Sequence, residues 1–369
     1  FHLFELKNRA TRNTLPSINI VDMRRELEEG NRSIFSRELY YEMEKTLVEG
    51  NQLILFLNRR GYTGFITCRS CGYVSKCNNC DISLTYHRST NRLRCHYCGE
   101  THAPPRSCPS CGSNYFKSFG IGTERVEEEV KKAFPNARIS RMDSDNIKTR
   151  DDYETALDSI KNKEIDILIG TQMISKGLDF PSVTLVGIIA ADTTLNLPDF
   201  RAPERTFQLV TQVSGRAGRG DVAGKVILQT YNPDHYSITT AMNNDYKEFF
   251  RNELELRKEF GYPPYREIAT ITLFGKNHQD VKESMEKSSA MLVKLVREAD
   301  LGEVDILGPN PAPMEKINNN YRWQILLKFG YNNHKDIRNI IRRVYTTGKG
   351  NFIKEDVKTS IDINPNSIL

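Results

Sequence analysis

The sequence has no apolar run that approaches the ~18 residues needed to span a bilayer, which excludes a transmembrane helix. The stretch Phe1 to Arg12 also lacks the basic, apolar and small-residue order of a signal peptide. We therefore expect a cytoplasmic protein with no membrane partner. Because the chain begins at Phe1, we also expect it to be cut from a longer protein. Its 369 residues suffice for two or three domains, each with a core of its own.

The sequence also has little excess charge of either sign. The formal net charge is +5, but this sum treats every cysteine as neutral. Four thiolates around one Zn²⁺ carry a net charge of about −2, so two such sites would lower the total to about +1. The net charge therefore does not identify nucleic acid as a partner. Any grip on DNA or RNA must come from local patches of Lys and Arg.

Cysteine is absent outside residues 68–111, and within this segment all eight cysteines form C-x-x-C pairs. The pairs are Cys68 and Cys71, Cys77 and Cys80, Cys95 and Cys98, and Cys108 and Cys111. Two sulfurs of one C-x-x-C turn can bind the same ion, and two turns complete a tetrahedral site, so the sequence predicts two structural zinc ions. Gly72, Gly99 and Gly112 each follow a second cysteine, which suits the open backbone that such turns require.

The alternatives to zinc are a disulfide framework and thioredoxin-like redox pairs. A cytosolic chain of this size needs no disulfides to fold, and no cysteine is left over as a nucleophile. Of the three ways to pair four turns, we prefer the nested one, because residues 81–94 resemble a hairpin that returns to an inner metal. The inner site is then Cys77, Cys80, Cys95 and Cys98, and the outer site is Cys68, Cys71, Cys108 and Cys111. His87, His96 and His102 could replace a thiolate, but we expect them at the surface or beside the sites.

Strand-like and helix-like segments alternate on both sides of the cysteines. The expected strands are 51–58, 137–142, 165–170, 183–190 and 225–230, and the expected helices are 33–48, 124–134, 150–161 and 203–213. Apolar strands that alternate with helices predict a parallel sheet covered on both faces. We therefore expect an α/β domain over 1–67 and 112–235, a zinc-binding insertion over 68–111 and a helical linker over 236–262.

The pattern changes at Gly261 to Tyr265 (GYPPY), whose prolines cannot continue a helix. The segments that follow are a strand at 267–274, a helix at 280–297, strands at 304–307 and 321–329, a helix at 335–345 and a strand at 357–363. This β-α-β-β-α-β order predicts an α+β, ferredoxin-like C-terminal domain over 263–369. Trp323 lies on an alternating apolar strand face, so we expect it in the core, with base stacking as the alternative.

Two stretches of the α/β domain are too specific to be explained by packing alone. Gly170 to Pro181 (GTQMISKGLDFP) is a loop of small and polar residues at the carboxyl end of a buried strand, where open α/β sheets bind ligands. Gln212 to Gly220 (QVSGRAGRG) closes a helix and carries two arginines that project to one side. These stretches resemble motifs V and VI of superfamily 2 helicases. The resemblance implies that the α/β domain is a RecA-like second helicase lobe.

The likeness covers essentially the whole chain. Leu57 to Tyr62 and Gly120 to Glu128 flank the cysteines, and together with GYPPY and Gly308-Pro309 they make the chain similar to the primosomal protein N′ family of replication-restart DNA helicases. This resemblance implies the C-terminal half of an ATP-dependent 3′ to 5′ DNA helicase that recognises stalled replication forks and directs primosome assembly. The zinc-binding segment would act in it as a wedge or a docking surface.

The resemblance also implies roles for individual residues. Arg216 and Arg219 would be catalytic arginine fingers that stabilise charge on the γ-phosphate of ATP, and Gln212 would orient groups beside them. Gly177 and Asp179 would face the nucleotide. Thr171 would contact a DNA phosphate, a base-independent contact that suits a motor.

Both the G-x-x-x-x-G-K-[ST] phosphate loop and the Asp-Glu box are absent from the sequence. ATP and Mg²⁺ would therefore bind only with a first lobe outside this chain, and we expect the chain alone to hydrolyse no ATP. The implied partners are forked and single-stranded DNA, the single-stranded-DNA-binding protein, and primosome and helicase-loading proteins. The acidic tail of the single-stranded-DNA-binding protein could bind a basic groove on the C-terminal domain. The residues of this groove would be Lys328, Arg338, Arg342 and Arg343. The alternative is that these residues form only a solvated helix face.

Two other functions stay open at this point. One is a non-catalytic DNA-binding or primosome-assembly scaffold that uses a helicase-like fold. It has no need of paired arginines at a glycine-rich helix end. The other is an RNA helicase lobe, which gives no reason for the cysteine insertion.

Overall fold

The computed structural model describes residues 16–57, 64–118, 122–143, 145–175, 180, 182–215, 224–347 and 349–368. The chain divides into two compact units, of which the first comprises residues 1–59, 121–194 and 205–246. The second comprises residues 60–120, 195–204 and 247–369, so it unites the zinc-binding segment with the C-terminal domain. The sequence suggested instead an insertion within the α/β domain, and the domain limits given above stay a prediction. Among the described residues, no helix is long and apolar enough to cross a bilayer.

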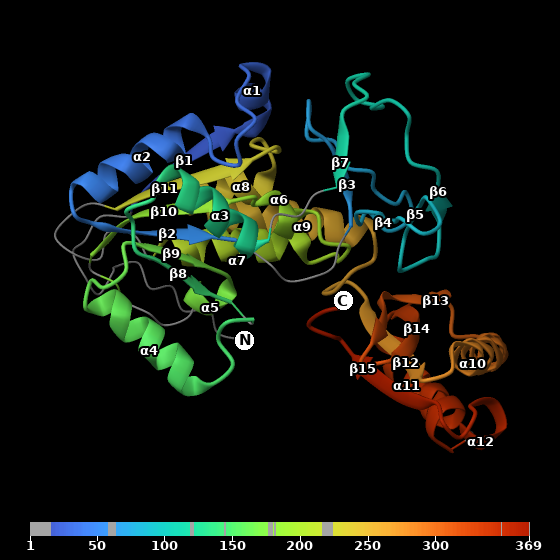
Figure 1. The fold of residues 1–369 in the computed structure, drawn as a ribbon. Helices are drawn as coiled ribbons and strands as arrows, with labels where there is room; N and C mark the ends of the chain where they lie inside the picture. The colour runs from blue at the N-terminus through green and yellow to red at the C-terminus, as the bar shows by residue number, and fades with distance from the viewer. Residues whose placement is uncertain are drawn as a thin grey trace. The chain divides into compact units, whose positions relative to one another are not determined.

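A parallel sheet of six strands forms the core of the first unit, in the order β1-β11-β10-β2-β9-β8 (Figure 1). Its strands are β1 (Ser17–Asp22), β2 (Gln52–Phe56), β8 (Ile139–Met142), β9 (Ile167–Gly170), β10 (Val183–Ile189) and β11 (Lys225–Thr230). Every neighbouring pair runs parallel. The central strands β2 and β9 are buried throughout, as expected for a parallel sheet with both faces covered.

Helices cover both faces of this sheet. Figure 1 shows α2 (Arg37–Val48) and α3 (Thr123–Ala133) on one face and α4 (Arg150–Lys161) and α7 (Ala202–Ser214) on the other. Shorter helices are α1 (Met23–Glu28), α5 (Gln172–Ser175), α6 (Asp192–Leu195) and α8 (Tyr236–Met242). The predicted α/β order is confirmed, with element ends shifted by a few residues. The strand β1 was missed, and it pairs with β11 at the edge of the sheet.

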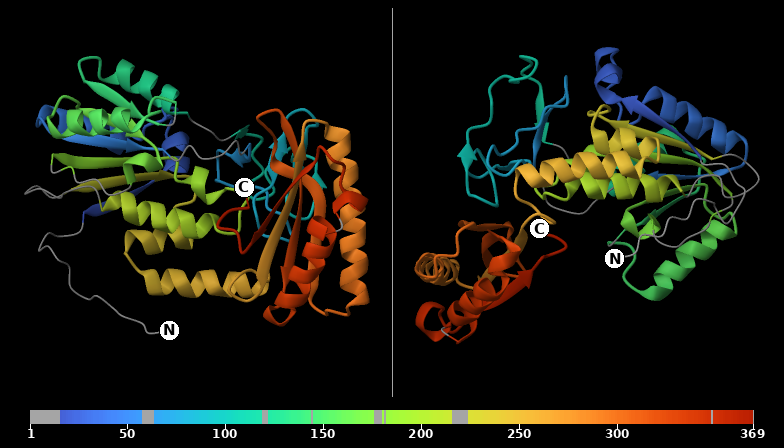
Figure 2. Two further views of the ribbon diagram at one scale, coloured as in Figure 1. Left: turned by 90° about the horizontal axis from the view of Figure 1, so that it is seen from below. Right: turned by 180° about the vertical axis from the view of Figure 1, so that it is seen from behind.

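The C-terminal domain, in the second unit, is a four-stranded antiparallel sheet in the order β13-β14-β12-β15. Its elements are β12 (Glu267–Gly275), α10 (His278–Glu298), β13 (Val304–Ile317), β14 (Asn320–Phe329), α11 (His334–Arg342) and β15 (Lys358–Ile363). Minor elements are the 3₁₀ turn Tyr331–Asn333, the π-helical turn Arg343–Thr347 and α12 (Lys349–Phe352), and α9 (Tyr246–Glu259) precedes the domain. Both views of Figure 2 show α10 beside this sheet. The predicted ferredoxin-like order is confirmed.

The strand β13 is longer than the predicted strand 304–307. The prediction stopped too early because three prolines interrupt the strand pattern of the sequence. A proline has no N–H to donate to a neighbouring strand, but an edge strand tolerates it. The strand β13 is an edge strand, and its register with β14 shifts between Leu307 and Asn310 and again between Pro311 and Lys316. These shifts bulge the strand toward the zinc-binding segment of the same unit, which the hydrogen bonds below confirm.

The zinc-binding segment consists of short strands around the cysteines. The strands β3 (Ile66–Cys68) and β7 (Phe116–Ser118) pair at its base, and β4 (Thr85–His87), β5 (Arg92–Arg94) and β6 (Thr101–His102) form a small antiparallel sheet. The pairing of β4 with β5 is the hairpin that the sequence predicted between the second and third cysteine turns.

Candidate metal centre and ligand-binding edge

The eight cysteines form two clusters, Cys68/Cys71/Cys108/Cys111 and Cys77/Cys80/Cys95/Cys98, in which all sulfurs lie within 4.8 Å of one another. The sulfur atoms are separated by 3.7 Å for Cys68 and Cys111, 3.5 Å for Cys71 and Cys108, and 3.5 Å for Cys77 and Cys98. Tetrahedral Zn–S bonds of about 2.3 Å place sulfurs about 3.8 Å apart. The clusters therefore fit two zinc ions, and the nested pairing is confirmed.

The four C-x-x-C turns share one backbone geometry. In each, the residue after the second cysteine donates its N–H to the carbonyl of the first, at 2.8 to 2.9 Å. That residue has a positive φ in every turn, between 75° and 82° at the three glycines and 48° at Asp81. The expected need for an open backbone is confirmed, and Asp81 is a residue type that tolerates this conformation.

The two clusters differ in exposure. In the inner cluster Cys77, Cys80 and Cys95 are buried, and they belong to an apolar core that includes Ile82, Leu93 and Tyr97. In the outer cluster Cys111 is exposed. Solvent and chelators can therefore approach the outer metal more directly.

We predict that a chelator removes the two zinc ions at different rates. Absorbance of a zinc-binding dye should show two phases of equal amplitude, the fast one from the outer site, because ligand exchange needs access to the sulfurs. Substituting Cys111→Ser should remove the fast phase and leave the slow one. Release of both ions in a single phase would contradict the difference in burial.

The three histidines lie beside the clusters, and among the described residues both clusters contain cysteine alone. The Nδ1 of buried His96 is 3.0 Å from the carbonyl oxygen of Pro311, and its Nε2 is 3.1 Å from Nε2 of His87. Burial lowers the pKa of His96 to about 4, so the ring is neutral and its Nδ1–H can donate to Pro311. The Nε2 of His102 lies 2.7 Å from Oε1 of Glu100.

The C-terminal domain holds the inner zinc turns by their backbone carbonyls. Tyr262 donates its hydroxyl to the carbonyl of Cys80 at 2.7 Å. The side-chain amide of Gln324 donates to the carbonyl of His96, and that of Asn310 to the carbonyl of Tyr97, both at 3.0 Å. These bonds join residues that are about 180 to 230 positions apart in the sequence, and most of their atoms are shielded from water, which makes each loss costly.

A stack of rings and cations continues this junction. The ring of Tyr262 stacks on that of Phe200, with centroids 4.6 Å apart and planes 8° apart. On Tyr262 lies Nζ of Lys328, 3.9 Å from the ring centre, which also donates to the carbonyl of Phe260 at 2.8 Å. Lys328 is only 4% exposed, and burial lowers its pKa. The inclusion of Lys328 in a basic surface groove was therefore wrong, because its ammonium group is used inside the junction.

We predict that Gly99→Ala destabilises the protein more than Gly112→Ala. Both glycines have positive φ after a second cysteine, so both substitutions carry about 1–2 kcal/mol of backbone strain. A Cβ at Gly99 would collide with Asn310, whereas one at Gly112 meets nothing within 4 Å. Asn310 must then rotate away and lose its hydrogen bond to the carbonyl of Tyr97, which should add about 1–3 kcal/mol to the destabilisation measured by denaturant unfolding. Equal destabilisation by the two substitutions would contradict the close packing of Asn310 against Gly99.

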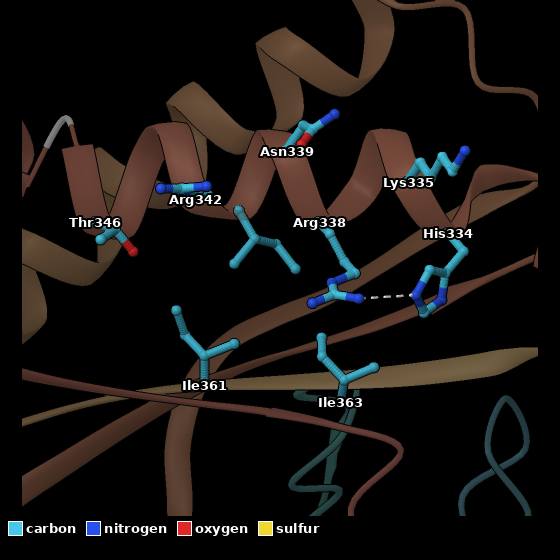
Figure 3. A pocket seen from close by; sticks show the side chains of 9 residues that line it. His334, Lys335, Arg338, Asn339, Arg342, Thr346, Ile361 and Ile363 are labelled. Atoms are coloured by element: carbon cyan, nitrogen blue, oxygen red, sulfur yellow. Dashed lines mark hydrogen bonds between the residues drawn. The ribbon is translucent and has the colours of Figure 1, made fainter.

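Two residues of the predicted basic groove, Arg338 and Arg342, line a hollow on the C-terminal domain. This hollow, of about 480 Å³, is lined by Arg338 and Arg342 of α11 and by Ile361 and Ile363 of β15. Figure 3 shows the two arginines above these isoleucines, with Arg338 directed toward His334. Arg343 is not among the lining residues that the structure describes.

The carboxyl edge of the parallel sheet, in the first unit, is shaped by buried acids. The hydroxyl of Thr123 at the start of α3 donates to Asp143 after β8 at 2.6 Å. After β10, Asp192 accepts from Oγ1 of Thr230 at 3.1 Å and from the amide of Asn232 at 2.7 Å. These acids fix the strand ends and the start of α3. The sequence analysis missed both, although Asp143 directly follows the predicted strand 137–142 and Asp192 lies two residues after the predicted strand 183–190.

The predicted nucleotide and catalytic residues are described only in part. Thr171 follows β9 at this edge, partly buried, and its N–H donates to the carbonyl of Met142 at 3.3 Å. Gln212 is exposed on α7. Gly177, Asp179, Arg216 and Arg219 lie outside the described residues, as do positions 58–63 and 119–121. The roles of all six residues stay predictions.

Comparison with known proteins identifies the class first. Residues 116–221, which supply three of the six strands of the parallel sheet, match the family described as "Helicase conserved C-terminal domain". The chain therefore belongs to the helicase class of proteins. Within this class it combines a helicase C-terminal lobe with two tetra-cysteine zinc sites and a ferredoxin-like domain. Residues 77–102 match the "PriA DNA helicase Cys-rich region (CRR) domain", and residues 258–366 match the "Primosomal protein N C-terminal domain". The chain belongs to the PriA family of replication restart proteins.

Curated relatives support this assignment over nearly the whole chain. The "Replication restart protein PriA" of Bacillus subtilis is 45% identical over 366 residues, which are 99% of this chain and 45% of that protein. The protein of the same name from Synechocystis is 44% identical over 332 residues, 89% of this chain and 40% of that protein. This chain therefore spans less than half the length of these two relatives. A solved structure of RecG bound to a three-way DNA junction covers 67% of this chain and 26% of its own at 12% identity, but its TM-score of 0.31 is too low to carry an argument.

Proposed function

We propose that this chain is the C-terminal half of an ATP-dependent 3′ to 5′ DNA helicase that recognises stalled replication forks and directs primosome assembly. The observation that carries the proposal is the 45% identity over 366 residues to a replication restart protein. The helicase match over residues 116–221 favours this function over a scaffold without catalysis. A cytoplasmic location and the domain limits stated above are part of the same proposal.

In this proposal the carboxyl edge of the parallel sheet meets nucleotide and DNA. Thr171 contacts a DNA phosphate, and Gly177 and Asp179, in the same loop, face ATP. Support comes from the position of Thr171, directly after the buried strand β9. Arg216 and Arg219 act as arginine fingers, with Gln212 orienting groups near them. Support comes from α7, whose buried Val210 and Val213 fix the helix one turn before these arginines.

The partners proposed are forked and single-stranded DNA, primosome and helicase-loading proteins, and the single-stranded-DNA-binding protein. For the last of these, the groove of α11 and β15 supports the docking of an acidic tail. Arg338 and Arg342 can pair with carboxylates, and Ile361 and Ile363 offer an apolar floor for neighbouring side chains.

ATP hydrolysis tests the proposed function. The purified chain should hydrolyse no ATP, with or without DNA, because it lacks the phosphate loop and the Asp-Glu box. The full-length protein that carries this chain should hydrolyse ATP, and single-stranded DNA should stimulate it. A full-length protein that binds forks without hydrolysing ATP would replace the proposal with the scaffold, and rapid hydrolysis by the chain alone would refute the need for a first lobe.

A further inference from the structure

A second hollow, of about 310 Å³, lies on the C-terminal domain where the bulged part of β13 crosses the start of β14. It belongs to neither the zinc clusters nor the groove under α11. The hollow is lined by His278, Pro311, Glu315, Lys316, Tyr321, Arg322 and Trp323. Three of these seven side chains are aromatic or imidazole rings, and two are basic, those of Lys316 and Arg322.

The rings of the hollow form one cluster. The centroid of the His278 ring lies 5.1 Å from that of Tyr321 and 6.1 Å from that of Trp323. The indole N–H of Trp323 donates to Nε2 of His278 at 3.3 Å, which fixes the tilt of the indole. Tyr321 pairs across the sheet with Gly275, so β12 contributes no side chain beside the phenol ring. The cluster is therefore held in place and partly open.

Each large ring of the cluster has a cation beside it. The Nζ of Lys316 lies 4.7 Å from the centre of the Tyr321 ring, and Nζ of Lys282 lies 5.9 Å from that of Trp323. Lys282 also lies 3.8 Å from Glu286, so Lys316 and Arg322 are the stronger sources of positive charge. Arg322, which also lines the hollow, is partly buried and donates to the carbonyl of Met314 at 3.4 Å.

The acid of the hollow is neutralised from the zinc-binding segment. Oε1 of Glu315 lies 3.6 Å from Nη1 of Arg94 and 3.5 Å from Nδ1 of His87. Arg92 is the first residue of the same strand, β5, and is exposed. The hollow therefore carries a positive charge that extends onto β5.

We propose that this hollow binds single-stranded DNA, with one unpaired base stacked on Tyr321 and Trp323 and the adjacent phosphates on Lys316 and Arg322. Rings that stack on bases, flanked by cations that reach the backbone, are the common design of sites for single strands without sequence preference. The proposal deepens the proposed function, because it rests on this protein meeting unpaired DNA.

An acidic peptide is the other class of ligand that positive charge could attract. The groove under α11 offers such a peptide an isoleucine floor, whereas this hollow offers ring faces. A base gains about 1–3 kcal/mol from stacking on such a face, and a short acidic side chain has no comparable contact. The rings therefore favour DNA here.

Trp323 is the single tryptophan of the chain, so its fluorescence reports this site in the unaltered protein. We expect an oligodeoxythymidylate of about 10 nucleotides to quench the emission saturably at low salt, and a duplex of equal length to quench it much less. Fluorescence anisotropy of the labelled oligonucleotide should give the same dissociation constant. Substituting Tyr321→Ala should weaken binding by about five- to 150-fold.

Matched variants separate stacking, charge and folding. Tyr321→Phe keeps the ring and should bind like the unaltered protein, and Arg297→Ala, at an exposed position near the end of α10, should also leave binding unchanged. Lys316→Ala should reduce the slope of binding against salt by about 0.7. Thermal unfolding shows whether each variant is folded. If Tyr321→Ala does not fold, the proposal is tested by the quenching of Trp323 in the unaltered protein and by the salt dependence of DNA binding in Lys316→Ala.

Three results would overturn the proposal. Binding by anisotropy without a change in Trp323 emission would place the DNA elsewhere on the protein. Quenching by an acidic peptide and not by DNA would assign the hollow to a protein partner. No binding of single strands at low salt would remove the site altogether. ATP hydrolysis by the full-length protein tests the proposed function separately, so the site and the helicase can fail independently.

Discussion

Substituting Arg216→Ala in the full-length protein that carries this chain is expected to lower ATP hydrolysis by about 10³- to 10⁵-fold and to abolish unwinding. The physical reason is the charge that develops on the γ-phosphate oxygens in the transition state. In the proposed mechanism, a guanidinium from the second lobe neutralises this charge when the lobes close on ATP. Binding of forked DNA should survive, because the proposal assigns the DNA contacts to other residues. Arg219→Ala should act in the same direction.

The matched control is Arg150→Ala, which removes an arginine of the same unit. Its side chain is 89% exposed, and its ion pair among the described residues is with Glu154, one helical turn away, an arrangement worth about 0.3–0.5 kcal/mol. Hydrolysis and unwinding should be unchanged in this variant. Unwinding at the normal rate by Arg216→Ala and by Arg219→Ala would contradict the proposed roles of these residues as arginine fingers.

The second large effect is expected from Cys95→Ser. Cys95 is buried in the core that joins the inner zinc turns to Ile268 and Leu326 of the C-terminal sheet. A structural zinc ion contributes about 10–16 kcal/mol of apparent binding energy to folding, so losing the inner ion should unfold the zinc-binding segment and expose that core. We expect about one zinc ion per chain and a large drop in the midpoint of thermal unfolding.

Cys111→Ser is the control for Cys95→Ser, because it removes a ligand of the outer ion at an exposed position. This variant should also retain about one zinc ion, but the core of the second unit should stay intact and unfold near the normal temperature. The burial of the inner cluster predicts this contrast. Two retained ions in Cys95→Ser, or equal destabilisation by both substitutions, would contradict it.

Local patterns made most of the fold predictable. Alternating apolar strands and helices gave the parallel sheet, and the β-α-β-β-α-β order gave the ferredoxin-like domain. The nested zinc pairing followed from a hairpin between the second and third cysteine turns, which β4 and β5 form. In each case the signal lay within a few residues of the element it predicted.

Long-range packing was not predictable in this way. Nothing beside Cys80 indicates that Tyr262 donates to its carbonyl, and nothing beside Lys328 indicates that Tyr262 covers its ammonium group. The proline-rich part of β13 was not predicted as a strand, because its strand character depends on pairing with β14. The zinc-binding segment therefore looked like an insertion in the α/β domain, although its core is shared with the C-terminal domain.

For the candidate catalytic residues, the sequence gives more information than the structure. Arg216 and Arg219 were reached by sequence alone, because a motif at a helix end is local. The described part of the chain stops at Gly215 and resumes at Gly224, so their geometry adds nothing to the prediction. Asp143 and Asp192 were missed because a single acid after a strand is common, and only the bonds to Thr123 and Asn232 set them apart.

Strand displacement by the full-length protein is the most direct test of the central claim, that this chain is half of a 3′ to 5′ DNA helicase. Two partial duplexes of the same sequence, one with a 3′ single-stranded tail and one with a 5′ tail, are incubated with ATP and Mg²⁺. The account predicts that the duplex with the 3′ tail is unwound and that the duplex with the 5′ tail is not. Unwinding of neither duplex, or of the 5′-tailed duplex alone, would contradict it.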